Sequence, residues 1–188
     1  MRIAVLGGSF DPVHHGHLVI GQALREALDA DQVRLIPAAE QPFKVGRHRA
    51  AATDRARMLE LAVSDDAAFV VDRVEIERGG PSYTVDTLAD LRRRFPDARL
   101  VLAIGSDAAA LFAKWRDPAG IRAMAEVVVF SRAGETPPEG VADRVVTVPR
   151  IDISSTAVRE RVRSGRSIRY WVPDTVARYI ASQGLYRD

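Results

Sequence analysis

The sequence predicts an α/β fold, a doubly wound domain in which helices flank a mainly parallel sheet. Two observations indicate this class. Short apolar runs rich in branched residues alternate with amphipathic segments, and continuous apolar strands separated by helices are typical of parallel sheets covered on both faces. The chain has 188 residues, 47% of them hydrophobic, which suits one domain with one core. We therefore expect residues 1–188 to form a single Rossmann-like domain with a helical C-terminus.

Each expected element follows from its residue pattern. The strands are expected at residues 2–8, 33–38, 69–76, 100–105 and 127–131, where branched apolar residues end at Gly, Pro or a polar turn. The helices are expected at residues 17–30, 53–64, 85–95, 107–115, 155–164 and 174–183. The stretch 132–144 is rich in Pro and Gly, so we expect a surface loop rather than a domain boundary.

Composition excludes some classes of site. The chain has no cysteine, which excludes disulfides and thiolate metal sites. It shows neither a leader sequence nor an apolar run near the ~20 residues of a membrane span, so we expect a soluble, cytoplasmic protein with no membrane partner. The formal net charge is only +2, and Lys44 and Lys114 are the only lysines. The arginine bias fits either coding composition or binding of planar anions.

Polar clusters follow four of the expected strands. They read "GGSFDPVHHGHL" at 7–18, "PAAEQPFK" at 37–44, "GGPSYT" at 79–84 and "GSD" at 105–107. Ligands of doubly wound sheets bind outside the carboxyl ends of the strands. We therefore expect these four loops to converge on one cleft.

The first cluster predicts a phosphate site. Gly7 and Gly8 let the main chain turn sharply and approach a ligand, and a helix beginning near His17 offers free N–H groups. His14 and His17 lie three residues apart, so a tight turn through Gly16 can aim both rings at one anion. Exposed loop histidines or a metal-binding pair remain alternatives, whereas a dinucleotide-binding turn lacks the GxGxxG spacing.

Two motifs together resemble a known superfamily. "GGSFDPVHHGH", with His14 and His17, resembles the first motif of the (T/H)xGH nucleotidyltransferases, and "IDISSTAVRER" at 151–161 resembles their ISSTxxR signature. "PSYTVDTL", "IGSD", the tryptophan of "AKW" and the tail "VPDTVARYIASQGLY" are similar to the bacterial nicotinate-mononucleotide adenylyltransferase family. The resemblance implies transfer of the adenylyl group of ATP to nicotinate mononucleotide, which forms nicotinate adenine dinucleotide and pyrophosphate in NAD biosynthesis.

The resemblance also implies roles for individual residues. It makes His14, His17 and Arg159 catalytic, as phosphate-binding groups rather than proton shuttles; a bound phosphate can hold either histidine protonated near neutral pH. The expected ATP-binding residues are Gly7, Gly8, Ser9, Phe10, Gly16, Gly105, Asp107, Ile153, Ser154, Ser155 and Thr156, and the expected acceptor-binding residues are Lys44, Ser82, Tyr83, Thr84 and Trp115. Magnesium is expected to arrive with ATP, without a protein ligand.

Several expectations keep a structural alternative. Ser9 can satisfy a turn, Asp107 can cap its helix, Lys44 can be an exposed loop residue, and Trp115 can be an ordinary core residue. We expect Asp11 and Pro12 to shape the first loop rather than to touch substrate, and Asp86 and Thr87 to open the following helix.

The chain departs from the family pattern in the loop after the second expected strand. Phe43 stands where many relatives carry a histidine, and Ala38 replaces a commonly polar residue.

Other functions also fit parts of the sequence. A sister adenylyl- or cytidylyltransferase that uses phosphopantetheine or a polyol phosphate would share both phosphate motifs but is not expected to carry "PSYTVDT". A nucleotide sensor would need only the ATP half of the cleft. Arginines interleaved with aromatics in "RERVRSGRSIRYW" hint at nucleic acid, but the small net charge disfavours that partner. The oligomeric state is left open.

Overall fold

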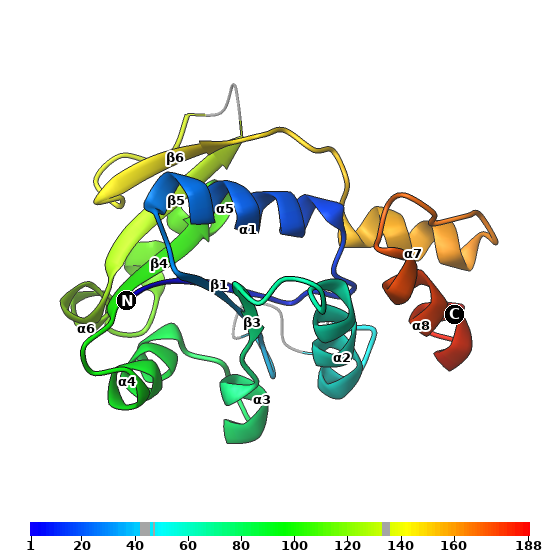
Figure 1. The fold of residues 1–188 in the computed structure, drawn as a ribbon, viewed down its shortest axis with the longest axis horizontal. Helices are drawn as coiled ribbons and strands as arrows, with labels where there is room; N and C mark the ends of the chain where they lie inside the picture. Colours follow the sequence, from blue (N-terminus) through cyan, green and yellow to red (C-terminus); the bar gives the residue numbers. More distant parts are fainter. Residues whose placement is uncertain (42–45, 47, 133–135) are drawn as a thin grey trace.

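The protein forms a six-stranded sheet with helices on both faces (Figure 1). The computed structural model describes residues 1–41, 46, 48–132 and 136–188. The strands are β1 Arg2–Gly8, β2 Gln32–Pro37, β3 Phe69–Val71, β4 Arg99–Gly105, β5 Glu126–Arg132 and β6 Arg144–Val148. The helices are α1 His15–Leu28, α2 Ala52–Ala62, α3 Val74–Arg78, α4 Thr84–Arg94, α5 Ser106–Ala109, the 3-10 turn η1 Phe112–Lys114, α6 Pro118–Met124, α7 Ser155–Arg163 and α8 Asp174–Gln183.

The strand order is β3-β2-β1-β4-β5-β6, and every neighbouring pair is parallel. This order confirms the doubly wound, Rossmann-like fold expected from the alternation of strands and helices. The winding reverses between β1 and β4, where Val5 is in register with Leu102. A ligand cleft is expected at the carboxyl end of this pair.

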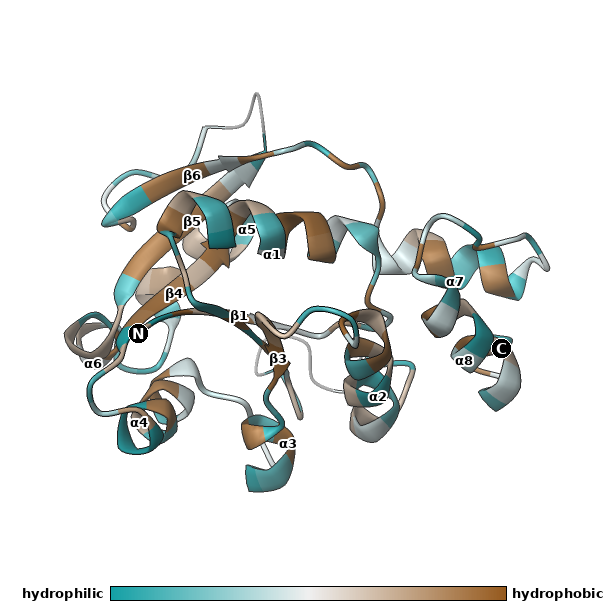
Figure 2. Ribbon diagram, in the orientation of Figure 1, coloured by the Kyte–Doolittle hydropathy of each residue, from teal (hydrophilic) through white to brown (hydrophobic). Residues whose placement is uncertain are grey.

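Alternate side chains of the central strand enter two different cores, because successive residues of a strand point to opposite faces. Ala4 and Leu6 join a cluster that includes residues of α1, α7 and α8. Ile3 and Val5 join a second cluster with residues of α4 and α6. Figure 2 shows β4 and β5 largely in brown, in agreement with strands that are covered on both sides.

The region around residues 69–76 differs from its expected single strand. β3 ends at Val71, and Val74–Arg78 forms the helix α3. Asp72 explains the change, because its buried carboxylate accepts the Val74 N–H at 3.2 Å and pairs with Arg34 at 2.8 Å. The side chain therefore stops the strand and starts the next turn.

The expectation of a single helix at 107–115 is also wrong. Two shorter turns, α5 and η1, occupy this region. The 3-10 turn brings side chains three residues apart onto one side, and the rings of Phe112 and Trp115 lie 5.4 Å apart against the second core cluster. Packing of these two aromatic rings thus accompanies the change of helix type.

Two elements lie outside the expected set, and several helix boundaries shift by one or two residues. The pattern did not predict α6 or β6, which pairs with β5 at the edge of the sheet. The first helix begins at His15 rather than at residue 17. Among the residues that the structure describes, no helix is both long and apolar enough to span a bilayer.

Candidate active site

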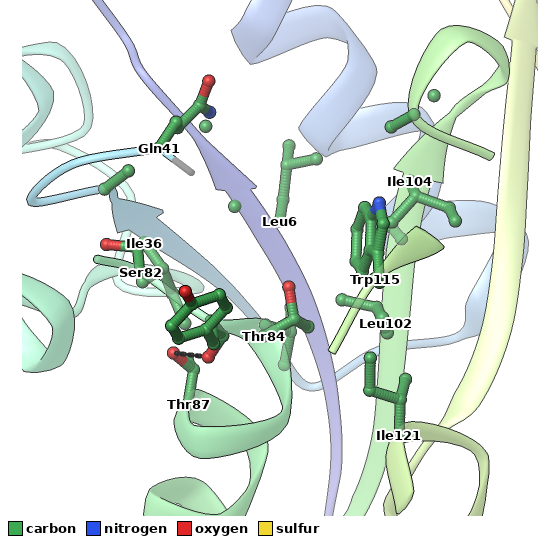
Figure 3. A pocket seen from close by; sticks show the side chains of 18 of the residues that line it. Leu6, Ile36, Gln41, Ser82, Thr84, Thr87, Leu102, Ile104, Trp115 and Ile121 are labelled. Carbon is green, nitrogen blue, oxygen red and sulfur yellow. Dashed lines mark hydrogen bonds between the residues drawn. The ribbon is translucent and has the colours of Figure 1, made fainter. Parts of the chain in front are cut away.

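A cavity of about 360 Å³ opens at the carboxyl ends of the strands (Figure 3). All four loops named from the sequence contribute to its lining, with Gly7, Gly8, Ala38, Gln41, Ser82, Tyr83, Thr84, Gly105 and Asp107. The floor is apolar and includes Val5, Ile36, Leu102 and Ile121. The structure therefore confirms that these loops converge on one cleft.

The two motif histidines lie against each other at the start of α1, and neither is among the residues that line this cavity. Their ring centroids are 3.8 Å apart. The His14 backbone N–H donates to Nδ1 of His17 at 3.2 Å, so Nδ1 of His17 is an acceptor and the neutral ring carries its proton on Nε2. A Cβ on Gly16 would lie 3.0 Å from the His14 ring. Glycine at this position thus leaves room for the pair.

Burial keeps both rings neutral in this structure. Burial lowers the pKa of His14 from 6.5 to about 4, with smaller effects of His15 and Arg132. Burial also lowers the pKa of His17, and the neighbouring His14 adds to the shift. Nδ1 of His14 is buried and has no hydrogen-bond partner among the described residues. Protonation of either ring would therefore need an anion to offset the cost of burying charge.

Phe10 and Gly8 connect the histidines to the cavity. Phe10 has a left-handed backbone, with φ at 48°, and its ring packs edge-on against His17 at 5.0 Å. A Cβ on Gly8 would lie 3.0 Å from the Phe10 ring, and Gly8 itself lines the cavity. The glycine is therefore required for the close approach of the Phe10 ring to the first strand.

The second motif lies directly against the first loop, although the two are far apart in the chain. Ser154 is the N-cap of α7 and accepts the Ala157 N–H at 3.1 Å, as expected for a capping serine. The Ser155 hydroxyl donates to the Pro12 carbonyl at 2.8 Å. The carbonyl of Ile153 lies 3.7 Å from the position of a Cβ on Gly16. These contacts place the start of α7 beside the start of α1.

Arg159 spans the same junction. Its Nη1 donates to the Asp11 carbonyl at 2.7 Å, and its Nη2 donates to the Thr156 hydroxyl at 3.0 Å. Asp11 is buried and accepts the N–H groups of Arg49 and Ala50. This supports the expectation that Asp11 shapes the loop, and it shows that the guanidinium of Arg159 is held in place from two sides.

Of the expected ATP-binding residues Ser9 and Asp107, only Asp107 lines the cavity. The Ser9 hydroxyl lies 3.1 Å from Nε2 of His48, on the segment that precedes α2. Asp107 is exposed in the first turn of α5 and lines the cavity. Within the described part of the chain, no side chain caps α5, so Asp107 does not act as a cap.

Two of the expected acceptor residues lie across the cavity from a third. Figure 3 shows Ser82 and Thr84 on one side and the Trp115 indole on the other. Ser82 is tied to the loop after β2, because its hydroxyl accepts the Ala39 N–H at 3.0 Å. Tyr83 precedes α4, and the guanidinium of Arg116 lies 4.9 Å from its ring. Phe43 and Lys44 lie outside the described residues.

Two buried residues of the site were missed by sequence reasoning. Arg55 is 1% exposed, and its guanidinium donates to four backbone carbonyls, those of Ser9, Ala38, Ala39 and Ala50. It thereby joins the loops after β1 and β2. Its neighbours Ala56, Met58 and Leu59 are also buried, but the sequence contained no signal that the arginine itself is buried.

Glu75 is the second missed residue, in the wall of the cavity. Its Oε1 accepts the Thr87 hydroxyl at 2.7 Å. Burial raises the pKa of Glu75, and the nearby hydroxyls of Thr87 and Ser82 oppose that rise. Glu75 lay in an expected strand, so the pattern contained no signal for its position.

The arginine-rich segment near the C-terminus packs largely on itself. The guanidinium of Arg161 stacks over Trp171 at 4.6 Å and donates to the Ser167 carbonyl at 2.7 Å. The Trp171 carbonyl accepts the His15 N–H at 3.1 Å. This segment therefore supports the start of α1, in addition to forming the surface beside α8.

Known proteins resemble the chain along its whole length. The cytidylyltransferase-like family matches residues 5–161. A probable nicotinate-nucleotide adenylyltransferase of Gemmatimonas aurantiaca is 45% identical, over 100% of this chain and 93% of that protein. A protein of the same description from a strain of Thermus thermophilus is 44% identical, over 100% of both chains.

Solved structures share the fold. The Plasmodium falciparum nicotinic acid mononucleotide adenylyltransferase complexed with NaAD superposes with a TM-score of 0.78 at 16% identity, covering 98% of this chain and 97% of that one. A putative nicotinate-nucleotide adenylyltransferase of Vibrio parahaemolyticus gives 0.74 at 20% identity, covering 100% and 97%. With full-length identity above 40% to the curated relatives, this chain belongs to the nicotinate-nucleotide adenylyltransferases, within the cytidylyltransferase-like family.

Proposed function

We propose that the protein transfers the adenylyl group of ATP to the phosphate of nicotinate mononucleotide, forming nicotinate adenine dinucleotide and pyrophosphate in NAD biosynthesis. The observation that carries the proposal is the junction of the two motifs, where the Ser155 hydroxyl bonds to the Pro12 carbonyl and Arg159 bonds to the Asp11 carbonyl. The full-length similarity to probable nicotinate-nucleotide adenylyltransferases supports it.

The proposed reaction is a direct displacement at the α-phosphorus. An oxygen of the acceptor phosphate forms the new P–O bond, and the bond from the α-phosphorus to the bridging oxygen of pyrophosphate breaks. The attacking oxygen is already ionised at neutral pH, so the step needs no general base. The protein must align the two phosphates and neutralise charge on the α-phosphoryl and leaving groups.

The cradle for the triphosphate would combine His14, His17, Arg159 and the first turn of α7. A neutral His17 has its proton on Nε2 when Nδ1 accepts the His14 N–H, so it offers a donor without a buried charge. Arg159 supplies a permanent positive charge near the same loop. The ATP-binding set that we propose is Gly7, Gly8, Ser9, Phe10, Gly16, Gly105, Asp107, Ile153, Ser154, Ser155 and Thr156.

The acceptor would occupy the cavity. The Trp115 indole gives a plane for the nicotinate ring, and the turn Ser82, Tyr83 and Thr84 offers hydroxyl and backbone donors for its carboxylate. Donors that bind the nicotinate carboxylate would lose a partner if an amide replaced it. This arrangement would favour nicotinate mononucleotide over nicotinamide mononucleotide. A contact of Lys44 with either phosphate stays a prediction.

Magnesium would arrive on the phosphate oxygens of ATP. Among the described residues, no group of three or more His, Cys, Asp or Glu side chains could hold a metal ion. We propose that ATP and water supply the ligands of the ion. A nucleotide-borne Mg²⁺ typically keeps several waters and needs few protein ligands. The cytoplasmic location also stays a prediction.

One assay tests the proposed function. The protein is incubated with ATP, Mg²⁺ and either nicotinate or nicotinamide mononucleotide, and pyrophosphate and dinucleotide are quantified. We expect both products with the acid and a much lower rate with the amide. Absence of dinucleotide with either acceptor, together with turnover of phosphopantetheine, would assign the chain to a sister adenylyltransferase instead.

A further inference from the structure

The buried carboxylate of Asp11 joins three segments of the chain. Asp11 is 4% exposed. Its Oδ1 accepts the Tyr186 hydroxyl at 2.7 Å and the Ala50 N–H at 3.1 Å, and its Oδ2 accepts the Arg49 N–H at 2.7 Å. The donors come from the loop before α2 and from the C-terminal end of the chain. Tyr186 is the only side-chain donor among these three.

Asp11 lies in the loop that carries the two motif histidines. It follows Phe10, whose ring packs on His17, and its carbonyl accepts Nη1 of Arg159 at 2.7 Å. A shift of Asp11 would therefore move the backbone that leads to His14 and the anchor of Arg159. The Tyr186 hydroxyl thus contacts the residue on which the proposed triphosphate cradle is built.

The C-terminal residues are shaped to make this contact. α8 ends at Gln183, and Gly184 has a left-handed backbone, with φ at 64°, which reverses the chain. Tyr186 is itself left-handed, with φ at 63°, and its ring packs against the first core cluster. Burial raises the pKa of the Tyr186 phenol, and the Asp11 carboxylate raises it further. The hydroxyl therefore stays protonated and acts as a permanent donor.

We infer that Tyr186 is a positioning residue for adenylyl transfer, which acts through Asp11 on the loop of His14 and His17. The inference rests on the proposed function. Loss of the hydroxyl leaves Oδ1 of Asp11 with the longer Ala50 bond, so the loop is less well fixed. Because the histidines stabilise charge in the transition state, a displaced loop should lower kcat more than it weakens substrate binding.

The chain offers a matched control for this bond. The Tyr179 hydroxyl also donates to a carboxylate, Oδ1 of Asp54 at 2.8 Å, but this bond joins α8 to α2 and does not involve the loop that carries the histidines. Tyr186→Phe and Tyr179→Phe each remove one hydroxyl from the C-terminal region and keep the ring. If the Tyr186 hydroxyl had a purely structural role, both substitutions would have similar effects on kcat.

The experiment measures kcat and both KM values for the full chain and the two variants, with thermal unfolding to establish that each is folded. We expect Tyr186→Phe to lower kcat about tenfold, with both KM values within about twofold, whereas Tyr179→Phe keeps wild-type kcat. Equal kcat in Tyr186→Phe and wild type, or equal losses in both variants, would overturn the inference.

A second readout separates this inference from the proposed function. The imidazole ¹⁵N resonances of His14 and His17 are recorded for all three proteins without substrate. We expect them to shift in Tyr186→Phe and to remain at their wild-type positions in Tyr179→Phe. Unchanged resonances in Tyr186→Phe would refute the positioning role, whereas a wild-type protein that forms no dinucleotide would refute the proposed function alone.

Discussion

The Ser155 hydroxyl donates a hydrogen bond of 2.8 Å to the carbonyl oxygen of Pro12, across a sequence separation of 143 residues. The contact joins the capping turn of α7 to the loop before α1. Because Arg159 bonds to the neighbouring Asp11 carbonyl, the junction contains a permanent positive charge and a set of helix amides. Such a combination is suited to binding a polyphosphate.

The first prediction concerns His17. His17→Ala removes a neutral donor from the proposed cradle, and we expect kcat to fall on the order of 100-fold because such donors stabilise developing charge. Steady-state rates with ATP and nicotinate mononucleotide measure the loss. His15→Ala is the control on the same helix, and its kcat should stay near wild type. A His17→Ala variant with near-normal kcat would remove His17 from the catalytic set.

The second prediction concerns pH. The pKa of His14 is about 4 in the folded protein against 6.5 without burial, so the unfolded state binds more protons between these values. Stability should therefore be fully present above pH 6.5 and fall as the pH is lowered toward 4. This histidine alone should account for a loss of about 2 kcal/mol in the free energy of unfolding between pH 7.5 and pH 5.

Urea unfolding of wild type and His14→Gln at the two pH values measures this loss. Glutamine cannot titrate, so the variant should show a smaller drop on acidification. The pKa of His17 is also lowered, so part of the pH dependence of stability should remain in the His14→Gln variant. An equal drop in both proteins would mean that His14 is not buried in its neutral form.

The third prediction concerns Arg55. Arg55→Met keeps most of the side-chain volume but leaves the carbonyls of Ser9, Ala38, Ala39 and Ala50 without this donor. We expect the free energy of unfolding to fall by about 3 kcal/mol. Arg57→Met on the same helix removes only an exposed pair with Glu60, so it should cost less than about 1 kcal/mol. Chemical denaturation of the wild type and both variants measures the two losses in the free energy of unfolding, and equal losses would contradict the prediction.

The fourth prediction concerns the acceptor turn. Glu75 accepts the Thr87 hydroxyl at 2.7 Å, and both residues line the cavity next to the turn of Ser82, Tyr83 and Thr84. Glu75→Ala should raise the KM for nicotinate mononucleotide about tenfold by releasing this turn, with little change in the KM for ATP. Glu77→Ala, an exposed position on the same helix, is the control. Parallel changes in both KM values would show a general loss of structure instead.

Local pattern predicted most of the fold. Five of the strands are recognisable as branched apolar runs, because strands covered on both faces contain few polar residues. The pattern did not predict β6, because it is an edge strand with Val145 exposed and it follows a Pro- and Gly-rich stretch. β3 ends early because Asp72 pairs with Arg34, a partner 38 residues away that no local window contains.

The motifs of the candidate site are visible in the sequence, but the buried residues that support them are not. Glycines and histidines in "GGSFDPVHHGH" indicate a phosphate site from composition and spacing. Arg55, Glu75 and Tyr186 act through partners that are distant in the chain, and an arginine, a glutamate or a tyrosine in isolation gives no sign of burial. Their roles emerge only when the fold brings the partners together.

The most direct test of the triphosphate cradle is a crystal structure with a non-hydrolysable ATP analogue and Mg²⁺. We predict that the imidazoles of His14 and His17, the guanidinium of Arg159 and the first amides of α7 lie within hydrogen-bonding distance of the phosphates. A triphosphate bound elsewhere, with these groups turned away from it, would contradict the proposal that the two motifs form one nucleotide site.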